Sequence, residues 1–83
     1  MRTYLVRRKY FRNTVLNYLL LIDPVGQQAE AYGICVASED GMTCAVKRIS
    51  FSQVRVFALL ERLIRNSVTP VTLRDVVEDW LLE

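Results

Sequence analysis

The sequence contains no histidine and only two cysteines among its 83 residues. Histidine is the side chain that most often carries general acid–base catalysis near neutral pH, so its absence argues against an enzyme. Two cysteines are too few for the disulfide framework of a small secreted domain. No phosphate-binding glycine loop, dinucleotide fingerprint or G-x-S-x-G motif is present either. We therefore predict no catalytic residue, no cofactor and no metal site.

Long apolar stretches are also missing. None is longer than residues 18–22, a length far below the ~20 residues that a membrane helix needs. Residues 7–11 (RRKYF) are faintly similar to a twin-arginine leader, and residues 29–31 (AEA) have the form of a cleavage site. The apolar stretch between them is short and interrupted by Asn17, which argues against a signal peptide. We expect a cytoplasmic protein with no membrane span.

What the sequence does contain is typical of one small folded domain. Apolar residues make up 52% of the chain and charged residues 24%, a composition that argues against disorder. The net charge is only +2, but the two signs are separated along the chain. Residues 1–22 hold five basic side chains and no acidic one, whereas residues 67–83 hold four acidic side chains and one basic one. The molecule therefore has a basic end and an acidic end.

Two segments alternate in apolar character with a period of two, as β-strands do: residues 14–23 and 30–37. The first segment is apolar on both faces, one formed by Leu16, Tyr18, Leu20 and Ile22, the other by Val15, Leu19 and Leu21. The second has one face of small residues only, which would let something approach closely: Ala31, Gly33, Cys35 and Ala37. Residues 23–26 (DPVG) between the segments have the composition of a β-turn.

The next loop sets the register of a third strand. A three-residue loop, residues 39–41 with Gly41 in the left-handed region, pairs Val36 with Cys44. This register puts the apolar sides of both strands on one face, whereas a loop one residue longer or shorter would turn one of them toward water. It also puts Cys35 and Cys44 on opposite faces, so we expect no disulfide between them.

The apolar period changes to that of a helix after Ile49. One helical arc, ending near Asn66, holds six large side chains: Val56, Phe57, Leu59, Leu60, Leu63 and Ile64. A second helix carries four on one side: Leu73, Val76, Val77 and Trp80. Each start is marked by a capping box and by a pair at hydrophobic-staple spacing. The boxes are Ser50 with Gln53 and Thr72 with Asp75, and the staples are Ile49 with Val54 and Val71 with Val76.

These elements predict an α+β domain over residues 14–83. A three-stranded antiparallel meander is followed by two C-terminal helices packed on one face of the sheet. Residues 1–13 have two interpretations, a basic arm or an extra edge strand.

Parts of the sequence resemble a known family. The segments that carry the resemblance are residues 32–34 (YGI), the helix start at residues 49–50 and, most strongly, residues 69–81. They are similar to a family of short uncharacterised proteins, a domain of unknown function, from spore-forming Gram-positive bacteria. The resemblance covers residues 14–83 and leaves out residues 1–12. It supports the fold and implies no activity, substrate or cofactor.

Two charged clusters are candidate contact sites. The first interleaves cations with aromatic residues and suits phosphate contacts and base stacking, an anionic membrane surface, or the protection of an edge strand from aggregation: Arg2, Arg7, Arg8, Lys9 and Arg12. No nucleic-acid motif accompanies these cations, so we favour edge protection.

The second cluster lies on one face of the last helix and suits a basic partner or a solvated surface: Asp75, Glu78 and Asp79. It offers too few ligands for calcium.

The favoured function is a small protein-binding or regulatory protein with an unknown protein partner. Weak self-association is expected because a short sheet leaves an edge on which little charge opposes pairing. The alternative is a nucleic-acid-binding accessory protein that uses the basic N-terminal arm. An enzyme comes third.

Overall fold

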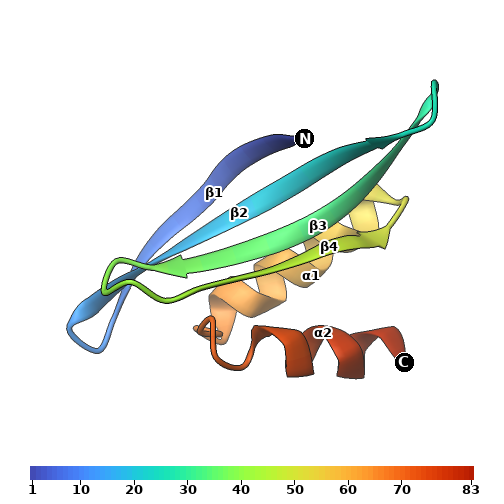
Figure 1. The fold of residues 1–83 in the computed structure, drawn as a ribbon. Helices are drawn as coiled ribbons and strands as arrows, with labels where there is room; N and C mark the ends of the chain where they lie inside the picture. The colour runs from blue at the N-terminus through green and yellow to red at the C-terminus, as the bar shows by residue number, and fades with distance from the viewer.

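The computed structural model describes residues 1–83 as a four-stranded antiparallel sheet followed by two helices (Figure 1). The strands lie side by side in the order β1-β2-β3-β4. Their bounds are Arg2–Phe11 for β1, Thr14–Val25 for β2, Ala29–Ser38 for β3 and Thr43–Ser50 for β4. Helix α1 spans Gln53–Arg65 and α2 spans Leu73–Leu81. The α+β class is confirmed, whereas the prediction of three strands is wrong because residues 2–11 add a fourth.

Strand β1 lies at one edge of the sheet and pairs with β2 along its whole length. Arg12 and Asn13 form the turn between the two strands, with φ angles of 50° and 60°. Two consecutive positive φ angles are the geometry of the type I′ turn, which two-residue hairpins favour. Because Arg-Asn lacks the glycine that usually marks this turn, the sequence alone does not decide between an arm and a strand.

The turn between β2 and β3 lies later than predicted. Strand β2 continues through Pro24 to Val25, and the chain reverses at residues 26–28, where Gly26 has a φ of 71°. The pairing of β1 with β2 extends only as far as Ile22 of β2, so Pro24 has no neighbouring strand on the β1 side. A proline has no N–H to donate and is tolerated where a strand is unpaired, which explains why Pro24 does not end β2.

The predicted register of β3 and β4 is confirmed. Val36 pairs with Cys44, and Ile34 with Val46. The connecting loop is closed by backbone hydrogen bonds from Ser38 N to the Met42 carbonyl oxygen, 2.7 Å, and from Gly41 N to the Ser38 carbonyl oxygen, 3.0 Å. Gly41 has a φ of 109°, a conformation that side chains disfavour. Both cysteines are free, and the register puts them on opposite faces of the sheet.

Both helices pack on the same face of the sheet, α1 against β2, β3 and β4 and α2 against β4 (Figure 1). Tyr18 is fully buried beneath them, and its hydroxyl donates a hydrogen bond of 2.9 Å to the carbonyl oxygen of Val68. Neither helix is long and apolar enough to cross a membrane. The core cluster has 14 buried residues: Leu16, Tyr18, Leu20, Ile22, Ile34, Val36, Val56, Leu59, Leu60, Leu63, Ile64, Val68, Leu73 and Val77.

The predicted helix starts are partly wrong. The side chain that caps α1 is Ser52, whose hydroxyl accepts a hydrogen bond from Arg55 N, 3.3 Å; Ser50 instead accepts one from Ser52 N, 3.0 Å. Thr72 is the N-cap residue of α2 but makes no side-chain capping bond. The two predicted hydrophobic staples are wrong as well, because one member of each pair is exposed to solvent. Val54, in the staple of α1, is 81% exposed, and Val71, in the staple of α2, is also exposed.

Candidate functional site

The face of the sheet opposite the helices carries a row of apolar residues. Leu5 pairs with Leu19, Leu19 with Cys35, and Cys35 with Ala45, so the row crosses all four strands. Leu5 is 58% exposed and the other three are half-buried. Because both helices pack on the opposite face, no element of the chain covers this row. We call this surface the open face.

Further apolar side chains extend the open face on either side of the row. Val15, Leu21 and Ala31 are buried, yet they are not among the residues of the core beneath the helices. The sequence contains a signal for this second apolar face, because residues 14–23 are apolar at both odd and even positions. The extension of this apolar face onto β1 could not be predicted, because the sequence does not decide whether the segment that contains Leu5 is an arm or a strand.

Ion pairs bound the open face at both ends of the strands. At one end, Arg8 donates hydrogen bonds of 2.8 and 3.0 Å to Oε2 of Glu39, and Asn17 donates one of 3.4 Å to the same atom. At the other end, Nε of Arg48 donates a hydrogen bond of 2.8 Å to the carboxylate of Asp23. The first pair reaches across β2 and the second across β3. The apolar row therefore lies between two polar boundaries.

These contacts set the charge of the open face. The hydrogen bond from Arg8 lowers the pKa of the Glu39 carboxyl, and the one from Arg48 lowers the pKa of the Asp23 carboxyl. Both carboxylates are therefore ionised at neutral pH, and each is balanced by its arginine. Burial raises the pKa of the Cys35 thiol, which keeps this group neutral and weakly nucleophilic. The open face has an apolar centre and an ion pair at each end, and Lys47 and the N-terminal amino group add positive charge near Asp23.

The small residue Gly33 accommodates an irregularity of β4. A Cβ atom at Gly33 would lie 2.4 Å from the carbonyl oxygen of Val46 and 2.9 Å from Cα of Lys47. The group that approaches this glycine closely is thus the backbone of β4 itself. The register of β3 and β4 shifts at the same point, and Arg48 adopts a φ of 53°. The shift presents Arg48 toward Asp23 on the far side of β3.

Three of the five predicted cations are engaged in contacts with the chain. Arg2 forms an ion pair with Glu30, and Arg8 forms the pair described above. Lys9 Nζ donates a hydrogen bond of 2.7 Å to the carbonyl oxygen of Ile64, near the end of α1. These contacts join β1 to β3, to the loop after β3 and to α1, so the cations help to hold the edge strand in place.

The five cations are also divided between different surfaces. Arg2, Arg7 and Lys9 are paired with residues of β2 that face the helices, whereas Arg8 is paired with one on the open face. Arg12 lies in the turn after β1, with its guanidinium 4.9 Å from the centre of the Phe11 ring. The structure therefore does not gather the basic residues into one surface.

The acidic residues of α2 are exposed on its solvent side. Asp75 lies in the first turn of the helix, where the helix dipole favours a negative charge, and Glu78 and Asp79 follow one turn later. No group of three histidine, cysteine, aspartate or glutamate side chains is placed so that it could hold a metal ion. A role for this cluster as a partner surface stays a prediction.

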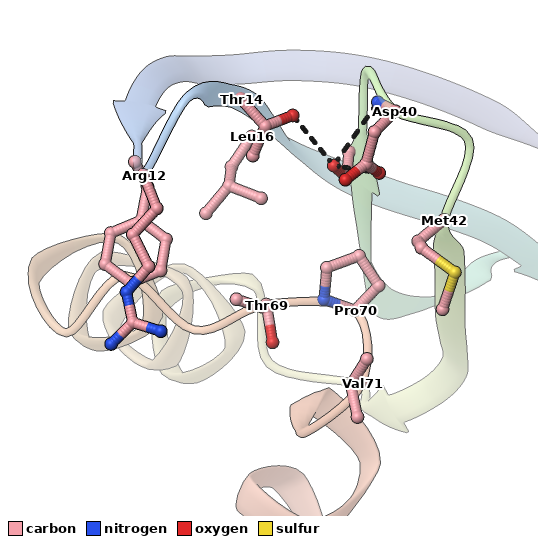
Figure 2. A pocket seen from close by; sticks show the side chains of 10 residues that line it. Arg12, Thr14, Leu16, Asp40, Met42, Thr69, Pro70 and Val71 are labelled. Atoms are coloured by element: carbon pink, nitrogen blue, oxygen red, sulfur yellow. Dashed lines mark hydrogen bonds between the residues drawn. The ribbon is translucent and has the colours of Figure 1, made fainter.

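A cavity of about 280 Å³ lies where the β1–β2 turn, the β3–β4 loop and the α1–α2 loop meet (Figure 2). Sequence reasoning gave no indication of it. The hydroxyls of Thr14 and Ser38 lie 3.1 Å apart, and Ser38 donates a hydrogen bond of 2.6 Å to Asp40. The polar groups on this wall therefore satisfy one another, and they tie β2 to the β3–β4 loop.

A second apolar patch lies on the helical side of the molecule, at the start of α1. Phe51 is 68% exposed, Val54 81% and Phe57 38%. Val54 and Phe57 border a shallow depression together with Gln53 and Glu61. This patch is confined to Phe51, just before α1, and to the first one and a half turns of that helix, whereas the open face extends across four strands.

The fold and the open face define a small α+β domain with one uncovered sheet face. Residues 3–83 match the model of a family of unknown function, DUF6514, and the chain belongs to that family. The match includes β1, so the expectation that residues 1–12 lie outside the family resemblance is wrong. No curated protein and no solved structure matches the chain. The family carries no assigned function.

Proposed function

We propose that the protein is a protein-binding module whose recognition surface is the open face. The observation that supports this most directly is the apolar row of Leu5, Leu19, Cys35 and Ala45 across the uncovered side of the sheet. An antiparallel sheet with one solvated face ordinarily alternates between apolar residues toward the core and polar residues toward water. Contiguous exposed apolar surface is a mark of a protein contact.

The charges around the row fit the same function. Protein interfaces typically combine an apolar centre, depleted of charge, with a polar rim. Here the rim is formed by the Arg8–Glu39 and Asp23–Arg48 pairs. Lys47 and the N-terminal amino group lie near the second pair and add positive charge at that end. The occupant that this surface suits is a flat apolar protein surface, such as the face of another sheet, with charges at its margin.

The alternative of nucleic-acid binding receives less support. Single-stranded nucleic acid is held by a continuous basic groove with stacking aromatic residues. In this chain the cations of β1 are divided between two faces of the strand, and Arg2, Arg8 and Lys9 are engaged within the molecule. We propose a binding role and no catalytic one, in a bacterial cytoplasmic setting, on the basis of the composition and the family resemblance.

A pull-down from source cells, run with and without nuclease treatment, tests this function when it compares three baits. Leu19→Asp places a charge at the centre of the open face, where the side chain is half-buried. Val54→Asp places the same charge on the exposed patch of α1 and serves as the matched control. We expect proteins captured by the wild type to be lost with Leu19→Asp and retained with Val54→Asp. Capture that survives Leu19→Asp, or that nuclease abolishes, contradicts the proposal.

A further inference from the structure

The apolar row is ordered by size across the sheet. The large side chains, Leu5 and Leu19, lie on β1 and β2, and the small ones, Cys35 and Ala45, lie on β3 and β4. Along this row, the surface is therefore raised over β1 and β2 and low over β3 and β4. Such a surface is complementary to a copy of itself that is turned by 180° about an axis parallel to the strands, because this rotation puts β1 over β4 and β2 over β3.

We infer that the open face binds a second copy of this chain, sheet against sheet, in a symmetric dimer; this inference rests on the proposed function. The twofold axis runs between β2 and β3, parallel to the strands. Leu19 of one protomer then packs against the partner's Cys35, and Leu5 against the partner's Ala45. Large side chains fill the space above small ones, as close packing of two sheets requires.

The alternative twofold axis, across the strands, gives a poorer fit. It would bring each row onto itself, with Leu5 against Leu5 and Ala45 against Ala45. Two large side chains would then collide at one edge, and two small ones would leave a gap at the other. The order of sizes along the row therefore selects the axis parallel to the strands.

The Asp23–Arg48 end of the face fits the same symmetry. Rotation about the axis parallel to the strands brings the partner's Asp23 over β3, the strand that Arg48 spans to reach Asp23 of its own protomer. The arginine then lies beside one carboxylate from each protomer.

The open face is also large enough for a dimer. The molecule measures 43 × 27 × 17 Å, and the sheet lies along its broad face, with the twelve residues of β2 running lengthwise. An interface of ordinary size buries about 800 Å² on each partner. The broad side of the molecule, 43 × 27 Å, is larger than that figure. The small residues of the row on β3 and β4 permit the spacing of about 10 Å between packed sheets.

Sedimentation equilibrium of the purified full-length chain tests the dimer. Over a protein concentration of 10 to 300 µM, the mass of the wild type should rise from that of the 9.6 kDa monomer toward twice that value. Leu19→Asp should remain monomeric at every concentration, whereas Val54→Asp should dimerise as the wild type does. A wild-type monomer throughout, or loss of the dimer in Val54→Asp alone, overturns the inference.

Thiol labelling gives a second readout that does not depend on how well Leu19→Asp folds. Cys44→Ser leaves only Cys35, which lies on the open face next to the axis, and Cys35→Ser leaves only Cys44, which faces the helices. A maleimide should label Cys35 more slowly as the protein concentration rises through the range of the sedimentation experiment, because the dimer covers this thiol, and it should label Cys44 at the same rate throughout. Labelling of Cys35 that does not slow with concentration, or equal slowing at both cysteines, overturns the inference.

The dimer and the proposed function can fail separately. If the purified chain stays monomeric but the pull-down still depends on Leu19, the occupant of the open face is a different protein, and only the inference is overturned. If neither the mass nor the pull-down depends on Leu19, both are overturned.

Discussion

Arg48 on β4 and Asp23 on β2 form an ion pair of 2.8 Å although β3 lies between their strands. The pair crosses β3 near Gly33, where β4 shifts its register and its backbone comes close. A side chain on β3 at this point would compete for the same space. The irregular end of β4, the glycine and the ion pair are thus one structural unit at the edge of the open face.

Gly33→Ala should destabilise the fold. The added methyl group would lie 2.4 Å from the carbonyl oxygen of Val46 and 2.9 Å from Cα of Lys47, and both of these are backbone atoms that cannot rotate away. Overpacking of this kind costs about 1–3 kcal/mol. The measurement is the free energy of unfolding from urea denaturation.

Gly26→Asn is the matched control. Gly26 has a φ of 71°, and a Cβ atom there would meet nothing within 4 Å. Asparagine tolerates this left-handed conformation better than other side chains do, so the cost should be well below that of Gly33→Ala. Equal losses at the two positions would show that the close approach of β4 is not what excludes a side chain at Gly33.

The strands that the sequence predicts correctly are those in which alternation and turn chemistry agree. The loop that ends at Gly41 and the apolar alternation of β3 and β4 both require Val36 opposite Cys44, and this register is observed. Strand β1 lacks this agreement, because its alternation is obscured by cations and a register shift after Leu5, and its turn, Arg12-Asn13, has no glycine.

The open face could be predicted only in part for the same reason. The part of this face that lies on the inner strands can be predicted from Leu19 and Leu21 on β2 and from the small residues of β3. Its width depends on β1, and its ion pairs depend on contacts between strands that are not neighbours in the sheet. Pairing across an intervening strand leaves no periodic trace in a sequence, so the Asp23–Arg48 and Arg8–Glu39 contacts required the structure.

Ser52→Ala should lower the stability of the protein by about 1 kcal/mol, because it removes the hydroxyl that accepts from Arg55 N at the start of α1. Thr72→Ala should have a much smaller effect, since Thr72 makes no side-chain capping bond to α2. Thermal denaturation of the two variants gives the comparison. A larger loss for Thr72→Ala would mean that the helix starts are capped as the sequence motif predicts and not as the structure shows.

Tyr18 should make the protein lose stability in alkaline solution. Burial raises the pKa of its hydroxyl from 10.0 to about 12, so the unfolded chain loses this proton at lower pH than the folded one. The stabilising contribution is complete below pH 10 and is lost as the pH rises through about 12. Urea denaturation between pH 8 and 12 should therefore show a steeper decline for the wild type than for Tyr18→Phe.

The same variant has a cost at neutral pH. Tyr18→Phe leaves the carbonyl oxygen of Val68 without its hydrogen-bond donor inside the core, which typically costs about 1–3 kcal/mol. The curves of the two proteins should consequently approach each other as the pH rises. Parallel curves across this range would assign the alkaline loss to other groups.

The Asp23–Arg48 pair should show the opposite pH dependence. The hydrogen bond from Arg48 lowers the pKa of the Asp23 carboxyl below 3.8, so the folded chain holds this proton less tightly than the unfolded one. The stabilisation is present above pH 3.8 and is lost as the pH falls through the lowered pKa. In Arg48→Gln, the Asp23 pKa measured by NMR should return toward 3.8, and the stability difference from the wild type should vanish in acid.

Arg8→Gln is the control, because it should raise the pKa of Glu39 and leave that of Asp23 unchanged. An Asp23 pKa that responds to Arg8→Gln instead would mean that the field of the whole face, and not the bond across β3, sets its value.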